Sequence, residues 1–141
     1  YHADSAGGLM NPDFIALDGG VTVAEALQEV RTSRVPLESL NVIFVTNEEG
    51  RLVASVTVAG LVRAHDGDLL SAVAREDVEH VHPLWYLHRV ARLMADFNVT
   101  VVPVVDEEHN ALLGVVTVDD LLEEMLPQGW RREFGMAAVE E

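Results

Sequence analysis

The chain of 141 residues contains no cysteine, so it has neither disulfide bonds nor a thiolate for catalysis or metal binding. It also contains no lysine: all 9 basic residues are arginine, and 24 residues are acidic, which gives a formal charge of −15. A negative field of this size repels nucleic acid and anionic lipid and attracts cations. We therefore expect no nucleic-acid partner. No apolar run approaches the roughly 20 residues that a membrane-spanning helix requires.

Sequence motifs of several enzyme classes are also missing. No serine lies in the G-x-S-x-G pattern of the α/β-hydrolases. The glycine pairs at 7–8 and 19–20 lack the G-x-x-x-x-G-K spacing of a phosphate-binding loop. Asp119 and Asp120 are adjacent, so on a helix their carboxylates lie about 100° apart and do not face one substrate. The sequence therefore shows none of these catalytic patterns.

The composition nevertheless suits a folded core. Apolar residues make up 49% of the chain and aromatic residues only 6%, which predicts a core of aliphatic side chains. The length fits one domain or two small lobes. The chain begins at Tyr1 without a methionine and ends in an acidic segment at Glu141, and we interpret it as part of a longer protein.

One stretch near the C-terminal end has the clearest secondary-structure pattern. Val101–Val105 and Leu112–Val116 are β-branched and aliphatic runs of strand length. The polar residues of Asp106–Ala111 between them predict a hairpin turn. Gly114 lies inside the second predicted strand, where the missing side chain indicates a close approach to the backbone.

The residues that follow this hairpin open a predicted helix. The hydroxyl of Thr117 and the carboxylates of Asp119 and Asp120 stand where side chains cap the free backbone N–H groups of a helix. The same groups are suited to bind the hydroxyls of a ligand that lies over the strand ends. The sequence leaves both interpretations open.

The hairpin and helix occur twice in the chain. Setting Leu112 on Leu52 aligns residues 101–122 with residues 41–62 and places Thr117 on Thr57 and Val105 on Val45. A supersecondary unit that occurs twice buries its sheet against its own copy. We therefore expect two halves related by pseudo-twofold symmetry, with clefts at the strand ends near Thr57 and Thr117.

A predicted helix precedes each hairpin. Thr22 and Glu25 have the spacing of a capping box. The helix that they open has one apolar face, made of Val23, Ala26, Leu27 and Val30. The second helix is predicted to begin at Pro83 or Leu84. Its apolar face consists of Leu84, Leu87, Ala91 and Met94, with Val90 and Phe97 beside it.

Three histidines offer a second kind of candidate site. His80 and His82 alternate on a predicted extended segment and so share a face, and His88 follows on a helix. Imidazole is a common ligand of transition metals. The spacing fixes no third ligand, however, so the pattern alone does not complete a metal site.

A tandem β-α-β-β-α repeat that ends in G-h-h-T-h-D-D, as LLGVVTVDDLL does at 112–122, resembles the CBS-domain pair, or Bateman module. DSAGGLMNPDF at 4–14 and ARLMADFNVTVVPVVDEE at 91–108 narrow the resemblance to the cytosolic part of MgtE-type magnesium transporters. The tail REFGMAAVEE at 132–141 resembles the family's link toward its membrane domain. The resemblance implies an α/β (α+β) fold of two packed repeats with pseudo-twofold symmetry.

The resemblance also implies domain boundaries. Residues 1–12 would be a lead-in from a preceding domain, and 13–76 and 77–126 the first and second CBS repeats. Residues 127–141 would connect to a membrane domain.

The resemblance further implies a regulatory module, and not an enzyme, at the cytoplasmic face of the cell membrane. Such a module forms a homodimer and controls a membrane-embedded transporter domain of the same chain. In the family, magnesium binds at acidic interfaces of this module, and the CBS pair can also bind ATP. Mg²⁺ and ATP, or another adenine nucleotide, are therefore the expected ligands.

The resemblance carries over to individual residues. It implies nucleotide contacts from Thr57, Pro103, Thr117 and Asp120. Because Asp120 keeps a family acidic position, we expect the metal-binding carboxylates to be those of Asp119, Asp120 and Glu123. The second half-site, at Thr117, is expected to be the better preserved one, because Gly60 stands where the second half has Asp120.

Other family positions carry different residues here. Family metal-site carboxylates fall on Tyr86, His88 and Asn98, and acidic positions of the link fall on Gln128, Arg131 and Arg132. In the nucleotide site, a basic–acidic pair falls on Ala59 and Gly60, and two aromatic positions fall on Val42 and Val99. Two alternatives therefore stay open: a structural dimerisation module that has lost ligand sensing, and an adenine-nucleotide sensor attached to another protein.

Overall fold

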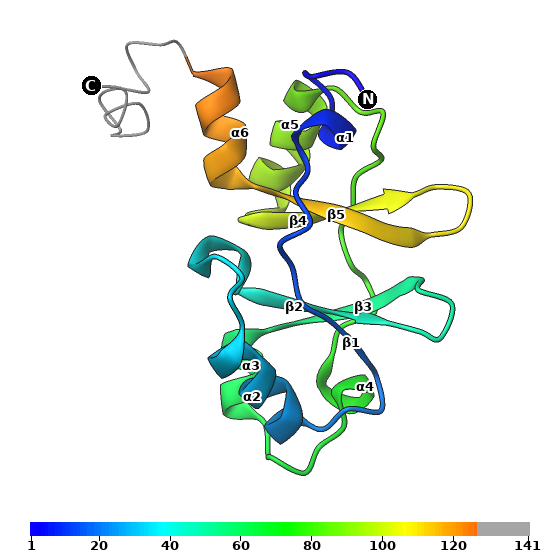
Figure 1. The fold of residues 1–141 in the computed structure, drawn as a ribbon, viewed down its shortest axis with the longest axis vertical. Coiled ribbons are helices and arrows are strands. Elements are labelled where there is room, and N and C mark those ends of the chain that lie inside the picture. The colour runs from blue at the N-terminus through cyan, green and yellow to red at the C-terminus, as the bar shows by residue number, and fades with distance from the viewer. Residues whose placement is uncertain (127–141) are drawn as a thin grey trace.

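The computed structural model describes residues 1–126 of the chain. The proposed connecting segment, with Gln128, Arg131 and Arg132, lies outside the described residues. The described part forms two lobes, which stand one above the other in Figure 1. Within residues 1–126, no helix is both long and apolar enough to cross a membrane.

The first lobe is built from the first repeat. It contains a strand, a helix, a 3₁₀ helix, a hairpin and two short helices, in this order: β1 (Ala16–Asp18), α2 (Val23–Thr32), η1 (Leu37–Ser39), β2 (Val42–Thr46), β3 (Leu52–Thr57), α3 (Val58–Arg63) and α4 (Leu70–Val73). β1 runs parallel to β2, and β2 runs antiparallel to β3.

The second lobe repeats this plan. It consists of α1 (Ala6–Leu9), α5 (Leu87–Phe97), β4 (Val101–Asp106), β5 (Ala111–Thr117) and α6 (Val118–Met125). β4 and β5 form an antiparallel pair. Val81 forms a parallel bridge with Val104 in the second lobe, and Leu17 of β1 pairs in the same way with Val45 in the first lobe. Val81 is therefore equivalent to Leu17. Both predicted hairpins and the helix after each are thereby confirmed.

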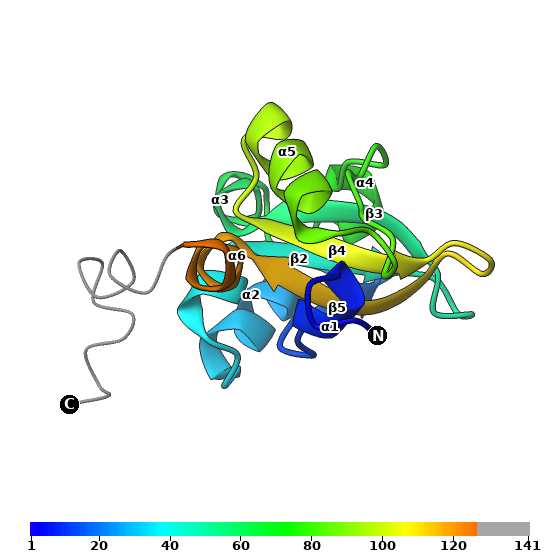
Figure 2. The same ribbon diagram turned by 90° about the horizontal axis from the view of Figure 1, so that it is seen from above.

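The two sheets face each other across the middle of the molecule. Phe44 and Leu52 of the first lobe meet Val101, Val105 and Val115 of the second in one buried cluster. Figure 2 shows the second hairpin crossing over the first. Helices cover the outer side of each sheet, where each lobe has an aliphatic cluster of its own. The sparse aromatic content thus corresponds to aliphatic cores.

Residues 4–11 pack on the second lobe, although they precede the first repeat in the sequence. The backbone N–H groups of Ala6 and Gly7 donate to the carbonyls of Trp85 and Pro83, each at 2.8 Å, and Leu87 N–H donates to Asp4 at 3.0 Å. The same three bonds occur in the first lobe, from Leu70 to Val21, from Ser71 to Gly19 and from Val23 to Asp68. α1 and α4 are therefore equivalent: α1 packs on the second lobe, and α4 packs on the first lobe.

The start of α5 differs from the prediction. The helix begins at Leu87, with Tyr86 as its N-cap, and not at Pro83 or Leu84. The carbonyls of Pro83 and Trp85 accept bonds from the segment of α1, so they are not used within a helix. Leu84 is consequently 67% exposed and lies outside the core, as does Phe97 at the other end of the helix.

The alignment of the two hairpins also needs a correction. Val45 pairs with Ala54, whereas Val104, and not Val105, pairs with the equivalent Gly114. The second turn is therefore one residue longer than the first. As a result, the residues of β4 align with those of β2 one position away from the predicted alignment. The close approach at Gly114 is confirmed: a Cβ atom there would lie 2.9 Å from the carbonyl oxygen of Asn11.

Candidate functional site

A cleft of about 430 Å³ opens where the two lobes meet, beside the start of α3. Its apolar lining comes from both lobes and includes Val42, Val56, Val99, Val101 and Pro103. Polar lining residues include Asn41, Ser55, Thr57, Asn98 and Thr100. Small-molecule sites combine an apolar surface with polar groups that orient the ligand, and the lining of this cleft offers both.

Thr57 lies at the N-terminus of α3 and lines this cleft. It is the N-cap of the helix, and its Oγ1 accepts a hydrogen bond from Gly60 N–H at 2.9 Å. The same hydroxyl can still donate its hydrogen to a group in the cleft. Gly60 brings no carboxylate, and a Cβ atom there would lie 3.2 Å from Thr57 Oγ1. The cap therefore positions the hydroxyl without closing the cleft.

Thr117, the residue equivalent to Thr57, is in a different environment. Thr57 is exposed, whereas Thr117 is only 2% exposed. Thr117 Oγ1 accepts from Asp120 N–H at 3.2 Å, so the capping part of the prediction is confirmed. Asp120 Oδ2 in turn accepts from the side-chain amide of Asn11 at 3.2 Å.

Of the four residues predicted to bind nucleotide, the structure brings two together in the cleft. Thr57 and Pro103 line it, and Thr117 and Asp120 do not. The loop between helix and hairpin explains part of this difference. In the first lobe it holds the 3₁₀ helix η1, which contacts β5, whereas in the second lobe it is a few residues, 98–100.

Two charged residues at the cleft did not stand out in the sequence. Arg75 pairs with Ser55 through both of its backbone groups, at 2.8 and 2.9 Å, which fixes its position beside β3. Its guanidinium group donates from Nε and Nη2 to the two carboxylate oxygens of Asp77, at 3.3 and 3.1 Å. This hydrogen bond lowers the pKa of the Asp77 carboxyl below its ordinary value. The available signal was that Arg75 is the only basic residue in the acidic stretch 66–77.

The residues that form the two lobes match a known family. The profile of the CBS domain matches residues 6–67 and again residues 70–127. The chain belongs to the CBS-domain family. The predicted fold class, an α/β pair of packed CBS repeats, is thereby confirmed. Each profile match begins with the short helix, α1 or α4, that packs on the other lobe, and continues through the remaining elements of its own lobe.

The CBS pair has relatives among magnesium transporters. It is 40% identical over 123 residues to the magnesium transporter MgtE of Thermus thermophilus, over 87% of this chain and 27% of the transporter. A crystal structure of the cytosolic domain of the Mg²⁺ channel MgtE in complex with ATP matches with a TM-score of 0.83 and 39% identity, over 89% of this chain and 50% of that chain. The CBS pair thus spans about a quarter of that transporter.

A CBS pair from a transcriptional regulator has a similar fold. The CBS domains of a transcriptional regulator from Streptococcus pneumoniae match with a TM-score of 0.73 and 25% identity, over 84% of this chain and 97% of that chain. The fold alone therefore does not decide to which protein a CBS pair is attached.

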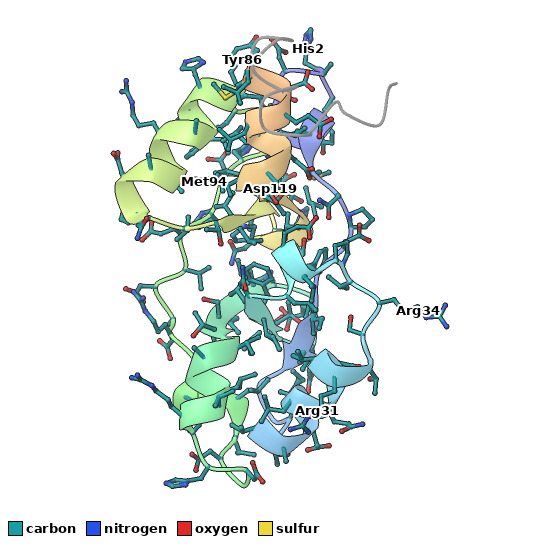
Figure 3. All side chains as sticks on the ribbon, turned by 90° about the vertical axis from the view of Figure 1, so that its left-hand side faces the viewer. His2, Arg31, Arg34, Tyr86, Met94 and Asp119 are labelled. Carbon is teal, nitrogen blue, oxygen red and sulfur yellow. The ribbon has the colours of Figure 1, made fainter. Side chains whose placement is uncertain are left out.

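The predicted metal ligands of the CBS pair lie on α6. Asp119 and Glu123 are exposed, and Asp120 is half-buried and bonded to Asn11. Figure 3 labels Asp119 on this helix and Tyr86 at the start of the neighbouring α5. Within residues 1–126, no three histidine or acidic side chains of one chain gather in a geometry that holds a metal ion.

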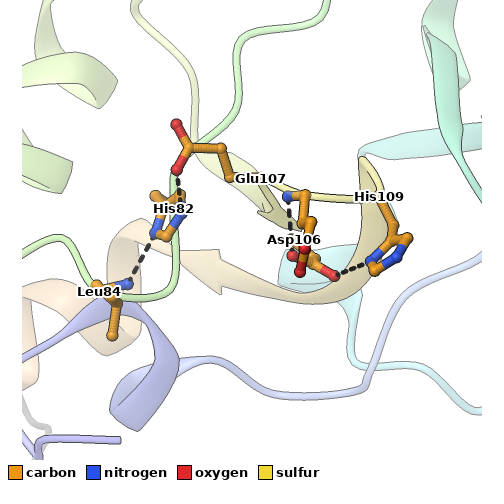
Figure 4. A network of polar contacts seen from close by, with 6 residues as sticks. His82, Leu84, Asp106, Glu107 and His109 are labelled. Carbon is orange, nitrogen blue, oxygen red and sulfur yellow. Dashed lines mark hydrogen bonds and ion pairs between the residues drawn. The ribbon is translucent and has the colours of Figure 1, made fainter.

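The histidines of the CBS pair make separate local contacts. His82 Nε2 lies 3.0 Å from the Glu107 carboxylate, and its Nδ1 accepts from Leu84 N–H at 3.3 Å (Figure 4). His80 and His82 line one cleft, whereas His88 lines another, beside Tyr86 and Met125. The structure therefore does not bring the three imidazoles to one site.

Proposed function

We propose that this CBS pair is a regulatory module of an MgtE-like magnesium transporter. The identity of 40% over most of the chain to a magnesium transporter is the observation that carries the proposal. In this function the module lies at the cytoplasmic face of the membrane and is joined to a membrane-embedded transporter domain of the same protein. It performs no catalysis and acts by changing conformation when it binds a ligand.

The proposed ligands are Mg²⁺ and an adenine nucleotide. For the nucleotide, we propose the cleft at Thr57 and Pro103, because these residues line an open space and Thr57 presents a hydroxyl group. For Mg²⁺, the proposal uses Asp119, Asp120 and Glu123, whose carboxylates are hard oxygen ligands. No complete set of metal ligands gathers within residues 1–126 of one chain. We propose that further ligands come from a second copy.

The proposal therefore includes a homodimer. Leu122 and Met125 on α6 are 40% and 45% exposed, and the half-exposed Tyr86 lines the same cleft as Met125. Exposed apolar side chains of this kind on neighbouring helices suit contact with a second copy. Such a dimer would bring two acidic helices together, and a divalent cation between them would relieve their repulsion.

Calorimetric titration tests the proposed function. The whole chain is titrated separately with MgCl₂ and with ATP, and sedimentation is followed with and without MgCl₂. Heat of binding from either ligand at millimolar concentration or below is the expected result. The absence of any heat of binding with both MgCl₂ and ATP would contradict the proposal.

One alternative function has an observation in its favour. At the start of α3, Ala59 and Gly60 stand where the resemblance places a charged pair of the nucleotide site, and Tyr86 and His88 stand where it places metal-site carboxylates. A CBS pair that has lost ligand sensing and only holds two subunits together would fit these replacements. It predicts a stable dimer whose sedimentation and melting temperature do not change with MgCl₂ or ATP.

A further inference from the structure

The cleft at Thr57 carries little positive charge for a site that would accept a phosphorylated ligand. Its charged lining residues are Arg75, Asp77 and Glu79, which give it a formal excess of one negative charge. Arg75 is the single cation among the described residues that line it. At the start of α3, Ala59 and Gly60 add no charge. Any phosphate group in this cleft therefore has one positive side chain available.

The backbone of Arg75 is fixed by hydrogen bonds, whereas its side chain is exposed. Two backbone hydrogen bonds to Ser55 fix the Cα atom of Arg75 beside β3. Ser55 lies two residues before Thr57 in this strand. The guanidinium group of Arg75 is bound to Asp77, but the two side chains are 76% and 75% exposed. Exposed ion pairs of this kind contribute little to stability, so the partner is easily exchanged.

The chemistry of the pair favours exchange with a phosphate. The fork of a guanidinium group binds the two oxygens of a carboxylate and two oxygens of a phosphate in the same geometry. Asp77 already occupies this fork through both of its oxygens. A phosphate that replaced Asp77 would keep both hydrogen bonds of the guanidinium group. Asp77 would then remain as a nearby like charge that opposes the phosphate.

We infer that Arg75 is the phosphate-recognition residue of this cleft and that Asp77 is its resting partner, which competes with the phosphate of the ligand. This inference rests on the proposed binding of an adenine nucleotide. The phosphate-binding charge then comes from the segment after α4, and not from the first turn of α3. Asp77 makes the cleft selective, because a ligand without phosphate gains nothing from releasing Arg75.

The test compares ATP with adenosine, both titrated into the whole chain by calorimetry in the presence of EDTA. Arg75→Gln is expected to weaken ATP binding about tenfold, which is the effect of one lost charged hydrogen-bonding group, and to leave adenosine binding within about twofold. Asp77→Asn is expected to tighten ATP binding. Arg51→Gln is the matched control, because Arg51 forms an exposed pair with Glu49 outside this cleft.

The outcomes separate the two proposals. ATP binding that Arg75→Gln leaves unchanged, or an equal loss for ATP and adenosine, would overturn the role of Arg75 and leave the nucleotide site standing. A wild-type chain that binds neither ATP nor adenosine would overturn both the role of Arg75 and the proposed nucleotide site. Melting temperatures of the variants confirm that each one is folded, which is expected because both side chains are exposed.

Discussion

The side-chain amide of Asn11 donates a hydrogen bond to the carboxylate of Asp120 at 3.2 Å, across 109 residues of sequence. The backbone of Asn11 also pairs with Val115, at 2.9 Å in both directions. Asn11 is therefore the counterpart of Arg75, which pairs with Ser55 in the first lobe. At equivalent positions, one half of the pair holds a neutral residue bonded to the helix start, and the other holds a cation at an open cleft.

This contact predicts an energetic coupling between the N-terminal segment and α6. In a double-mutant cycle of Asn11→Ala and Asp120→Ala, measured by urea denaturation, we expect a coupling free energy of about 1 kcal/mol, the typical net value of a hydrogen bond. Asp120→Ala should leave the chain folded, because Thr117 still caps α6. Additive effects of the two changes would show that the contact contributes nothing.

A second prediction concerns the close approach at Gly114. A Cβ atom there would lie 2.9 Å from the backbone oxygen of Asn11 and 3.1 Å from Met10 Sδ, so Gly114→Ala forces the segment away from β5. We expect a loss of about 1–3 kcal/mol in the free energy of unfolding, as for overpacked cores. Gly67→Ala is the control, because nothing lies within 4 Å of its added Cβ. Equal stability of the two variants would contradict the prediction.

A third prediction follows from the capping box of α2. Glu25 accepts bonds from the backbone N–H and hydroxyl of Thr22, and the backbone bond is the main cause that lowers the pKa of Glu25. A carboxyl whose pKa is lower in the folded state stabilises the fold above its unfolded pKa of about 4.3. This stabilisation disappears as the pH falls through the folded pKa.

The melting temperatures of the wild type and Glu25→Gln should therefore differ at pH 7 and converge toward pH 3. Glu29→Gln is the control, because Glu29 lies on the same helix beyond its first turn. A difference that persists unchanged at pH 3 would assign the effect to something other than ionisation of Glu25.

A fourth prediction tests the proposed dimer. Leu122→Arg places a charge among the exposed apolar side chains of α6, so it should weaken self-association at least tenfold in sedimentation experiments. Leu37→Arg is the control, since Leu37 is 80% exposed and lies on η1 rather than on α6. A dimer that tolerates Leu122→Arg as well as Leu37→Arg would exclude this face.

Local signals in the sequence predicted much of the fold. The Thr22–Glu25 capping box and the two hairpins depend on residues close together in the sequence, and both are confirmed. The glycine inside the second predicted strand also indicated the close approach at Gly114, although its partner Asn11 lies far away in the sequence. The start of α5 was predicted wrongly. Pro83 is a normal first residue of a helix, but here its carbonyl bonds to Gly7, a partner that no local pattern indicates.

The sequence by itself determined the repeat and the cap at Thr117, because hydrophobic pattern, turn residues and capping spacing act within a few residues. The CBS fold was predicted from the resemblance of the sequence motifs to that family. The sequence also predicted that the second half-site would be the better preserved one, by comparing Asp120 with Gly60. Only the tertiary structure decided that Thr57 is exposed in a cleft while Thr117 is buried. The exposure of a side chain depends on what packs over it, and here Asn11 and η1 approach α6 and β5 from distant parts of the chain.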